Sequence, residues 1–239
     1  MRATLFGVAA SHPALAAELM LQHKGVDYRR VDLPTVTHRT LLRAMGYPRK
    51  TVPAIRIEGA KVQGTTEIAR ALDALVPSPP LFPADTERRD EVEIANAWGD
   101  EVLQPVPRRL TLNGLGKADG AAVRSYLEDA KLGVPVKLVA PVAPAVAAMS
   151  RRVNRATDEA AARDLAALPG LIDRVDDLIG RGVIGGSGRN VADFQIATSI
   201  SLLLTMDDVR PMIEGRPAER LARELVPDQP GHVPRVFSA

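Results

Sequence analysis

The chain of 239 residues contains no cysteine. This absence excludes structural disulfides, metal sites built on thiolates and a cysteine nucleophile. Reactions that pass through a disulfide between the protein and a substrate are excluded for the same reason.

Aromatic residues are also scarce, at 3% of the chain. A hydrophobic core must therefore be built from Leu, Val, Ile and Ala, which the 46% hydrophobic content allows. The charges nearly cancel, with 31 Lys and Arg against 29 Asp and Glu, and no basic arm or Arg-rich patch stands out. We therefore expect no nucleic-acid partner.

Long apolar runs are missing as well. The most apolar stretch, residues 131–149, is interrupted by Pro135, Lys137, Pro141 and Pro144, so it falls short of the roughly 20 residues that a membrane span needs. The N-terminus lacks the separate apolar core and cleavage site of a secretory signal. The four histidines lack metal-ligand spacing. We expect a cytoplasmic protein with no membrane contact and no metal.

The order of hydrophobic patterns divides the chain in two. Residues 1–77 read as strand, helix, strand, short helix, two hairpin strands and a helix, which predicts a four-stranded mixed sheet with helices on both faces. Residues 78–85 form a proline-rich linker, and residues 86–239 carry helical patterns only. These include a proline-interrupted helix around residues 136–150 and two successive helices at 157–168 and 169–182. The predicted fold is a thioredoxin-like α/β domain followed by an all-α helical bundle.

Three short motifs accompany this order. Val52-Pro53 precedes the strand pattern of residues 54–57, where the proline could either start a strand or form a cis peptide, which costs only about 0.5–1 kcal/mol before proline. Gly64-Thr65 opens a helix with Ile68 and Leu72 on its apolar stripe. The segment from Asn190 to Phe194 has the pattern of a capping box, in which Asp193 reaches back to the start of the helix.

Together, these motifs and the two-part order resemble the glutathione S-transferase superfamily over nearly the whole chain. The resemblance implies a cis Val52-Pro53 bond, which turns the Val52 backbone toward a bound thiol peptide. It also implies that Ser11, after the first strand, donates a hydrogen bond to the thiolate of glutathione. Ser11 could instead be only a helix cap, with a nearby tyrosine (Tyr28 or Tyr47) or a backbone N–H as the donor. The thiol-peptide residues implied in this way are Thr51, Val52, Pro53, Gln63, Gly64 and Thr65.

The sequence departs from the family pattern at the glutathione subsite. Gly64 stands where the family usually has an acidic residue or Gln, and Thr51 replaces a residue that is frequently basic or polar. Two alternatives to a glutathione transferase therefore stay open: a non-catalytic member that binds protein partners, and a transferase that uses another thiol. The missing cysteine leaves conjugation, thiol-assisted isomerisation or peroxide reduction as the possible reactions.

The remaining expectations concern the helical part. An apolar electrophile would bind between the two parts, near Trp98, Leu103 and Arg108, although an apolar stripe there is more often core. Val92, Ile94, Ala95, Trp98 and Val102 are predicted to point inward. His12 is expected to be solvated and Asp193 to serve folding. By resemblance alone we expect a homodimer.

Overall fold

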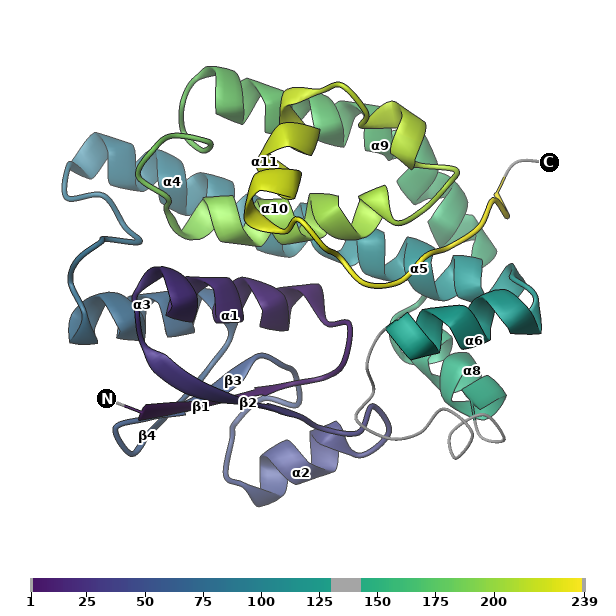
Figure 1. The fold of residues 1–239 in the computed structure, drawn as a ribbon, viewed down its shortest axis with the longest axis horizontal. Coiled ribbons are helices and arrows are strands. Elements are labelled where there is room, and N and C mark those ends of the chain that lie inside the picture. Colours follow the sequence, from purple (N-terminus) through teal and green to yellow (C-terminus); the bar gives the residue numbers. More distant parts are fainter. Residues whose placement is uncertain (1, 130–142, 238–239) are drawn as a thin grey trace.

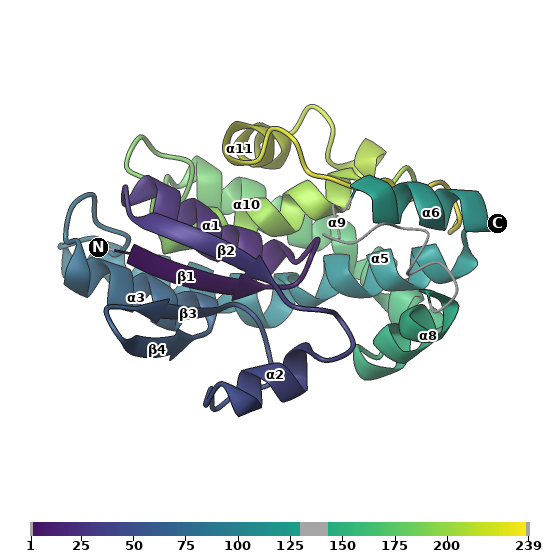
Figure 2. The same cartoon turned by 60° about the horizontal axis from the view of Figure 1, so that its bottom comes forward.

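The computed structural model describes residues 2–129 and 143–237. Its N-terminal part contains a four-stranded sheet in the order β2-β1-β3-β4, in which β1 and β2 are parallel and the other pairs are antiparallel. Helices α1 and α3 cover one face of the sheet and α2 lies on the other (Figures 1 and 2). The elements are β1 (Arg2–Gly7), α1 (His12–His23), β2 (Asp27–Asp32), α2 (His38–Ala44), β3 (Ala54–Ile57), β4 (Ala60–Gln63) and α3 (Thr65–Leu75).

Helices make up the regular structure of the described residues after α3, apart from the single β-bridge between Met206 and Val233. They are α4 (Thr86–Trp98), α5 (Pro105–Lys117), α6 (Gly120–Asp129), α8 (Ala143–Val153), α9 (Asp158–Gly180), α10 (Val191–Leu204) and α11 (Pro217–Leu225). The predicted mixed sheet followed by a helical part is therefore confirmed. The helix expected around residues 136–150 begins at Ala143 in the described part, and residues 130–142 lie outside it.

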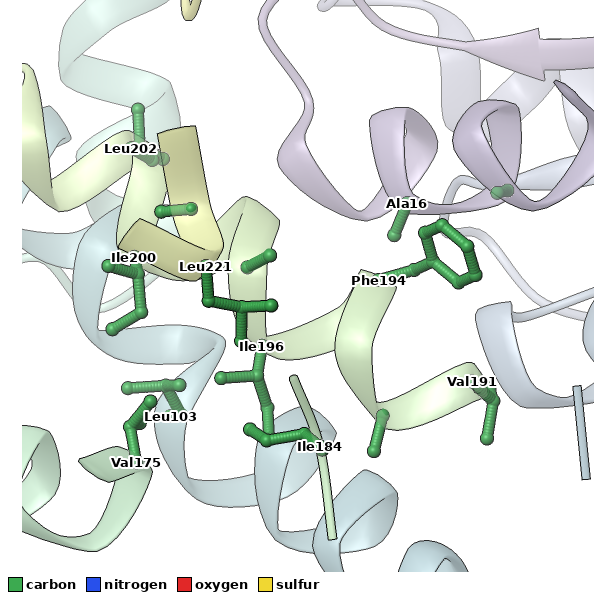
Figure 3. Close-up of a cluster of buried hydrophobic side chains, with 14 of the residues drawn as sticks. Ala16, Leu103, Val175, Ile184, Val191, Phe194, Ile196, Ile200, Leu202 and Leu221 are labelled. Carbon is green, nitrogen blue, oxygen red and sulfur yellow. The ribbon is translucent and has the colours of Figure 1, made fainter. Parts of the chain in front are cut away.

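Helix α10 is the centre of the molecule. All of its residues are buried, and it packs against α1, α4, α5 and α11. Figure 3 shows Phe194 of α10 beside Ala16 of α1, which joins the helical part to the sheet part, with Ile196 and Ile200 turned toward other helices. Burial of each large side chain contributes roughly 1.5–3 kcal/mol, so this helix fixes how the two parts sit against each other.

A full capping box starts α10, as the sequence predicts. The Asn190 side chain accepts hydrogen bonds from the backbone N–H groups of Ala192 and Asp193, at 3.0 and 3.3 Å. The buried Asp193 carboxylate accepts from the Asn190 N–H at 2.9 Å and from the Gly185 N–H at 2.7 Å. Burial raises the pKa of the Asp193 carboxyl, against the effect of these hydrogen bonds. Asp193 contacts the backbone at the start of α10, as expected of a residue that serves folding.

The predicted inward face of the first helix after the linker is partly wrong. Val92, Ala95 and Trp98 are buried, but Ile94 is 63% exposed and Val102 is 47% exposed. Ile94 lies two positions from Val92, on the opposite side of the helix. A single π-helical turn, Gly99–Leu103, follows α4 and adds one residue to the turn, which rotates Val102 outward before α5 begins.

The structure also differs from the sequence prediction around Pro169, where one helix takes the place of two. Two successive segments, 157–168 and 169–182, form one helix, α9, that continues through Pro169. Thr157 caps its start by accepting a hydrogen bond from the Ala160 N–H at 3.2 Å.

None of the helices in the described residues is both long and apolar enough to cross a lipid bilayer.

Candidate functional site

A cleft of about 1560 Å³ lies between the sheet part and the helical part. Its walls come from the loop before α1, the loop before β3, the start of α3, and from α4, α5, α6 and α8. The predicted residues that line it are Ser11, Thr51, Val52, Pro53, Gly64 and Thr65. The fold thus brings all the predicted site residues except Gln63 to one cavity.

Ser11 is the N-cap of α1. Its Oγ accepts a long hydrogen bond, 3.4 Å, from the Ala14 N–H, and its own N–H donates to the Val8 carbonyl at 3.0 Å. No acceptor for the Ser11 hydroxyl proton is found among the residues that the structure describes. Ser11 can therefore cap the helix and still donate a hydrogen bond into the cleft, so its two expected roles are compatible.

His12 corrects an expectation, because it is 3% exposed rather than solvated. Its Nε2 lies 3.2 Å from the backbone carbonyl of Gln104, at the start of α5. Burial, followed by the nearby charge of Arg108, lowers the pKa of His12 to about 3. The imidazole is therefore neutral at physiological pH and ties α1 to α5.

The peptide bond between Val52 and Pro53 is cis, which confirms the second of the two possibilities for this proline. The Pro53 carbonyl accepts a hydrogen bond from the Gly64 N–H at 3.0 Å. Neither backbone polar group of Val52 has a hydrogen-bond partner within the described ranges 2–129 and 143–237. This short segment can therefore pair with an extended ligand backbone.

Gln63 turns away from the cleft. Its side-chain amide donates to the carbonyls of Arg49 and Thr51, at 2.8 and 2.6 Å, and accepts from the Arg49 N–H at 2.7 Å. These three bonds hold the loop before β3 in place. Gln63 thus positions Thr51 and Val52, whereas direct ligand contact by Gln63 stays a prediction.

The space in front of Gly64 is already occupied. A Cβ atom there would lie 2.2 Å from the Glu67 carboxylate and 2.9 Å from the Arg49 guanidinium, and the φ angle of +105° favours glycine. Glu67 and Arg49 form an ion pair at 2.7 Å. A carboxylate from the first turn of α3 therefore stands where the family usually places the side chain of residue 64.

The start of α3 is open to the cleft. Gly64 offers no side-chain cap, and within the described part of the chain the backbone N–H groups of Thr65 and Thr66 have no acceptor. Thr66 instead accepts a hydrogen bond through its hydroxyl from Asn96 of α4, at 2.8 Å. Free N–H groups at a helix start attract anions such as carboxylates.

Tyr28 and Tyr47, the two tyrosines of the sheet part, lie outside the cleft, whereas the expected electrophile residues divide between core and cleft. Tyr47 is buried against Phe6, with ring centroids 6.0 Å apart, and Tyr28 donates a hydrogen bond to Glu18 at 2.8 Å. Neither tyrosine lines the cleft. Trp98 and Leu103 belong to the core cluster, while Arg108 does line the cleft.

Known proteins share the arrangement of a four-stranded sheet part followed by a helical part. Residues 5–80 match the family model of the glutathione S-transferase N-terminal domain. The solved structure of a glutathione S-transferase from Rhodospirillum rubrum is similar at 19% identity, covering 98% of this chain and 97% of that one, with a TM-score of 0.60. The chain has the glutathione S-transferase fold. The resemblance expected from the sequence is thereby confirmed for residues 5–80, and the likeness over the rest of the chain is one of fold.

Two further glutathione S-transferase-fold structures show the range of this likeness. The beta-etherase LigF of a Sphingobium species is 18% identical over 94% of this chain and 98% of its own, with a TM-score of 0.61. A glutathione S-transferase of Methylobacterium radiotolerans, solved in complex with glutathione sulfonate, is 16% identical over 94% and 90%, with a TM-score of 0.59. A search of curated proteins finds no match.

Within this glutathione S-transferase fold, sequence reasoning missed Glu67, Arg49 and Asn96 as cleft residues. The helical period could have placed Glu67 beside residue 64, because residues three apart share one face of a helix. Arg49 and Asn96 come from other elements and meet α3 only through packing, so no sequence signal pointed to them.

Proposed function

We propose that this protein binds glutathione in the cleft and favours its thiolate for attack on a small electrophile. The observation that carries the proposal is that Ser11, at the N-terminus of α1, lines the same cleft as Val52 and Thr65. The likeness to a glutathione S-transferase that was solved with glutathione sulfonate supports it.

The energy needed to form the thiolate is modest. A free thiol has a pKa of about 8.5, and lowering this to about 6.5 takes roughly 2.7 kcal/mol of preferential stabilisation. A hydrogen bond from the Ser11 hydroxyl to the charged sulfur contributes about 1.5–3 kcal/mol. The N-terminus of α1 adds about 0.3–1 kcal/mol, so the two effects together suffice.

The rest of the tripeptide finds matching groups. The unpaired backbone groups of Val52 can bond to the cysteinyl backbone of glutathione, and the free N–H groups at the start of α3 can hold the γ-glutamyl carboxylate. The Glu67 carboxylate binds the ammonium group of the γ-glutamyl residue and so replaces the side chain that Gly64 lacks. In this role Glu67 exchanges part of its contact with Arg49 for the ligand.

The kind of reaction follows from the missing cysteine. Because the protein supplies no thiol of its own, the reaction is conjugation, thiol-assisted isomerisation or peroxide reduction by the bound thiol. The sulfur of glutathione supplies the electron pair, and its proton leaves before the attack. We place this reaction in the cytoplasm.

A homodimer belongs to the same proposal. It rests on the family likeness, and size-exclusion chromatography with light scattering tests it. A mass of one subunit at micromolar concentration would contradict it.

Isothermal calorimetry with reduced glutathione at pH 7 tests the binding step. We expect a dissociation constant between micromolar and millimolar. Absence of heat up to about 10 mM would put the binding free energy weaker than roughly −3 kcal/mol and would overturn glutathione as the ligand.

A second function is favoured by one observation. The ion pair of Glu67 with Arg49 already satisfies the carboxylate, so a thiol without a γ-glutamyl ammonium would leave that pair intact. If calorimetry with glutathione shows no binding, the proposed function becomes a transferase for such a thiol or a non-catalytic binding protein. Binding of cysteinylglycine without binding of glutathione would select the first of these.

A further inference from the structure

Arg108 of α5 differs from two other arginines that line the cleft. Arg49 pairs with Glu67 at 2.7 Å, and Arg70 pairs with Glu93 at 3.6 Å. Arg108 forms no hydrogen bond and no ion pair with any residue in the described ranges, although it is half-buried. A charged group that is withdrawn from water without a counterion costs free energy, so such a group calls for a ligand of opposite charge.

The surrounding charges leave Arg108 uncompensated. Burial lowers the pKa of its guanidinium, and the favourable charge of Asp100 offsets this only in part. Asp100 accepts a hydrogen bond from Gln195 of α10 at 3.2 Å and forms neither an ion pair nor a hydrogen bond with Arg108. The positive charge therefore faces the cleft without a partner among residues 2–129 and 143–237.

Thr111 provides a second donor on the same side of α5. It lies three residues after Arg108, lines the cleft and is 5% exposed. Its buried hydroxyl has no hydrogen-bond partner among the described residues. Two unsatisfied donors one helical turn apart match an acceptor with two oxygens, such as a carboxylate.

The character of α5 changes along its length. Gln104, Arg108, Thr111, Leu112 and Leu115 all line the cleft and share one helical face. The polar end lies at His12, next to Ser11, whereas the apolar end faces α6 and α8, which Figures 1 and 2 place at the end of α5 away from the sheet. Cleft residues of these two helices include Val123, Tyr126, Val146 and Val153.

We propose that Arg108 and Thr111 bind the carboxylate of the second substrate, an apolar carboxylic acid whose hydrocarbon part lies over Leu112 and Leu115. This names the chemical class of the second substrate for the proposed transferase, without assigning its electrophilic atom, and rests on that function only in treating the acid as a substrate. The carboxylate sits toward Ser11, and the apolar body extends toward α6 and α8.

The test compares two ligands of equal shape and different charge, 4-phenylbutyrate and 4-phenylbutanamide. Calorimetry is done with the full chain at pH 7.5, without glutathione. We expect the carboxylate to bind about tenfold more tightly than the amide, the ratio that one charge-assisted hydrogen bond supports. Arg108→Gln is expected to remove this preference, and Thr111→Val to reduce it about threefold.

Arg39→Gln is the matched control, because Arg39 also lines the cleft but is exposed. Its preference for the carboxylate should equal that of the wild type. The urea midpoint of each variant shows that the fold is retained.

Several results would overturn the proposal. These are equal affinity of the wild type for both ligands, no binding of the carboxylate up to about 10 mM, and a preference that survives in Arg108→Gln. A loss of preference in Arg39→Gln equal to that in Arg108→Gln would also overturn it. So would an equal weakening of glutathione binding by Arg108→Gln, because Arg108 would then serve the thiol peptide. If glutathione fails to bind while the carboxylate preference is present, the transferase function falls and the carboxylate site stands.

Discussion

Two helix starts in this protein are built in opposite ways. At the start of α10, Asn190 and Asp193 satisfy each other's backbone N–H groups, and the Asp193 carboxylate is fully buried. At the start of α3, Gly64 supplies no cap and the first N–H groups face an open cleft. The first start holds the two parts of the chain together, and the second is free to hold something else.

The difference teaches how to separate folding residues from ligand-binding residues in this fold. Polar groups that find partners inside the chain lower the free energy of the folded state. Polar groups that face a cavity without partners gain little until a ligand arrives. Ser11 stands between the two classes, because one of its hydrogen-bonding functions is used and the other is not.

Removing the carboxylate of the closed start should have the largest effect. We expect Asp193→Ala to lower the free energy of unfolding by about 3 kcal/mol, because the buried N–H of Asn190 loses its acceptor and the N–H of Gly185 loses its hydrogen bond. Urea unfolding followed by circular dichroism measures this loss. Asp85→Ala is the control, because the exposed cap of α4 should cost only about 1 kcal/mol. Equal losses in the two variants would remove the distinction.

Ser11 provides the next largest effect, on turnover. Ser11→Ala should reduce turnover with glutathione by about 10- to 100-fold, the equivalent of one hydrogen bond to a thiolate. Thr157→Ala removes a comparable cap, at the start of α9, and should leave turnover unchanged. Steady-state rates of both variants at equal folded fraction make the comparison. Unchanged turnover in Ser11→Ala would reduce Ser11 to a helix cap.

His12 gives a pH-dependent effect on stability. Its pKa is about 3 in the folded chain against 6.5 for the free side chain, so the unfolded chain binds the extra proton as the pH falls below 6.5. Between pH 7.5 and 5.5 this should lower the free energy of unfolding by about 1.4 kcal/mol. The urea midpoint should fall as the pH decreases across this range, and it should fall less steeply in His12→Gln than in the wild type. Parallel curves for the two proteins would show that His12 does not carry this linkage.

Glu67 should give the smallest effect, confined to one ligand. Glu67→Gln is expected to weaken glutathione binding by about fivefold, near 1 kcal/mol, while cysteinylglycine binding stays the same. Calorimetry with both peptides measures the difference. Glu93→Gln, on α4 in the same cleft, serves as the control and should change neither. Equal weakening of both peptides would contradict the assignment of Glu67 to the ammonium.

Most of the fold was predictable because its signals are local. Alternating and helical periods predicted the mixed sheet and the helical part, and the Asn190 and Asp193 pattern predicted the start of α10. The exposed positions of Ile94 and Val102 were not predictable in the same way. The π-helical turn after Trp98 arises where α4 packs against α10, and it changes which side chains face the core.

The residues of the candidate site also fall into those with a local sequence signal and those without one. Ser11, Val52 and Thr65 carry signals in the sequence, because a cap, a proline and a helix start are features of a few adjacent residues. Thr111 and Asn96 carry none, because their surroundings come from residues far away in the chain. Arg108 was expected near the electrophile, but its missing counterion among the described residues also depends on distant segments. His12 was expected to be solvated for the same reason, since its contact with Gln104 joins positions 92 residues apart.

The sequence by itself determined the order of the elements, the caps, the proline at the edge of the sheet and the absence of any protein thiol. Each of these depends on neighbours within about five residues or on composition alone. Only the tertiary structure decided that Gln63 supports a loop, that Glu67 fills the space beside Gly64, and that Arg108 faces the cleft without a counterion in the described part of the chain. The physical reason is that burial and charge compensation depend on which distant segments pack together, and a local pattern does not record that.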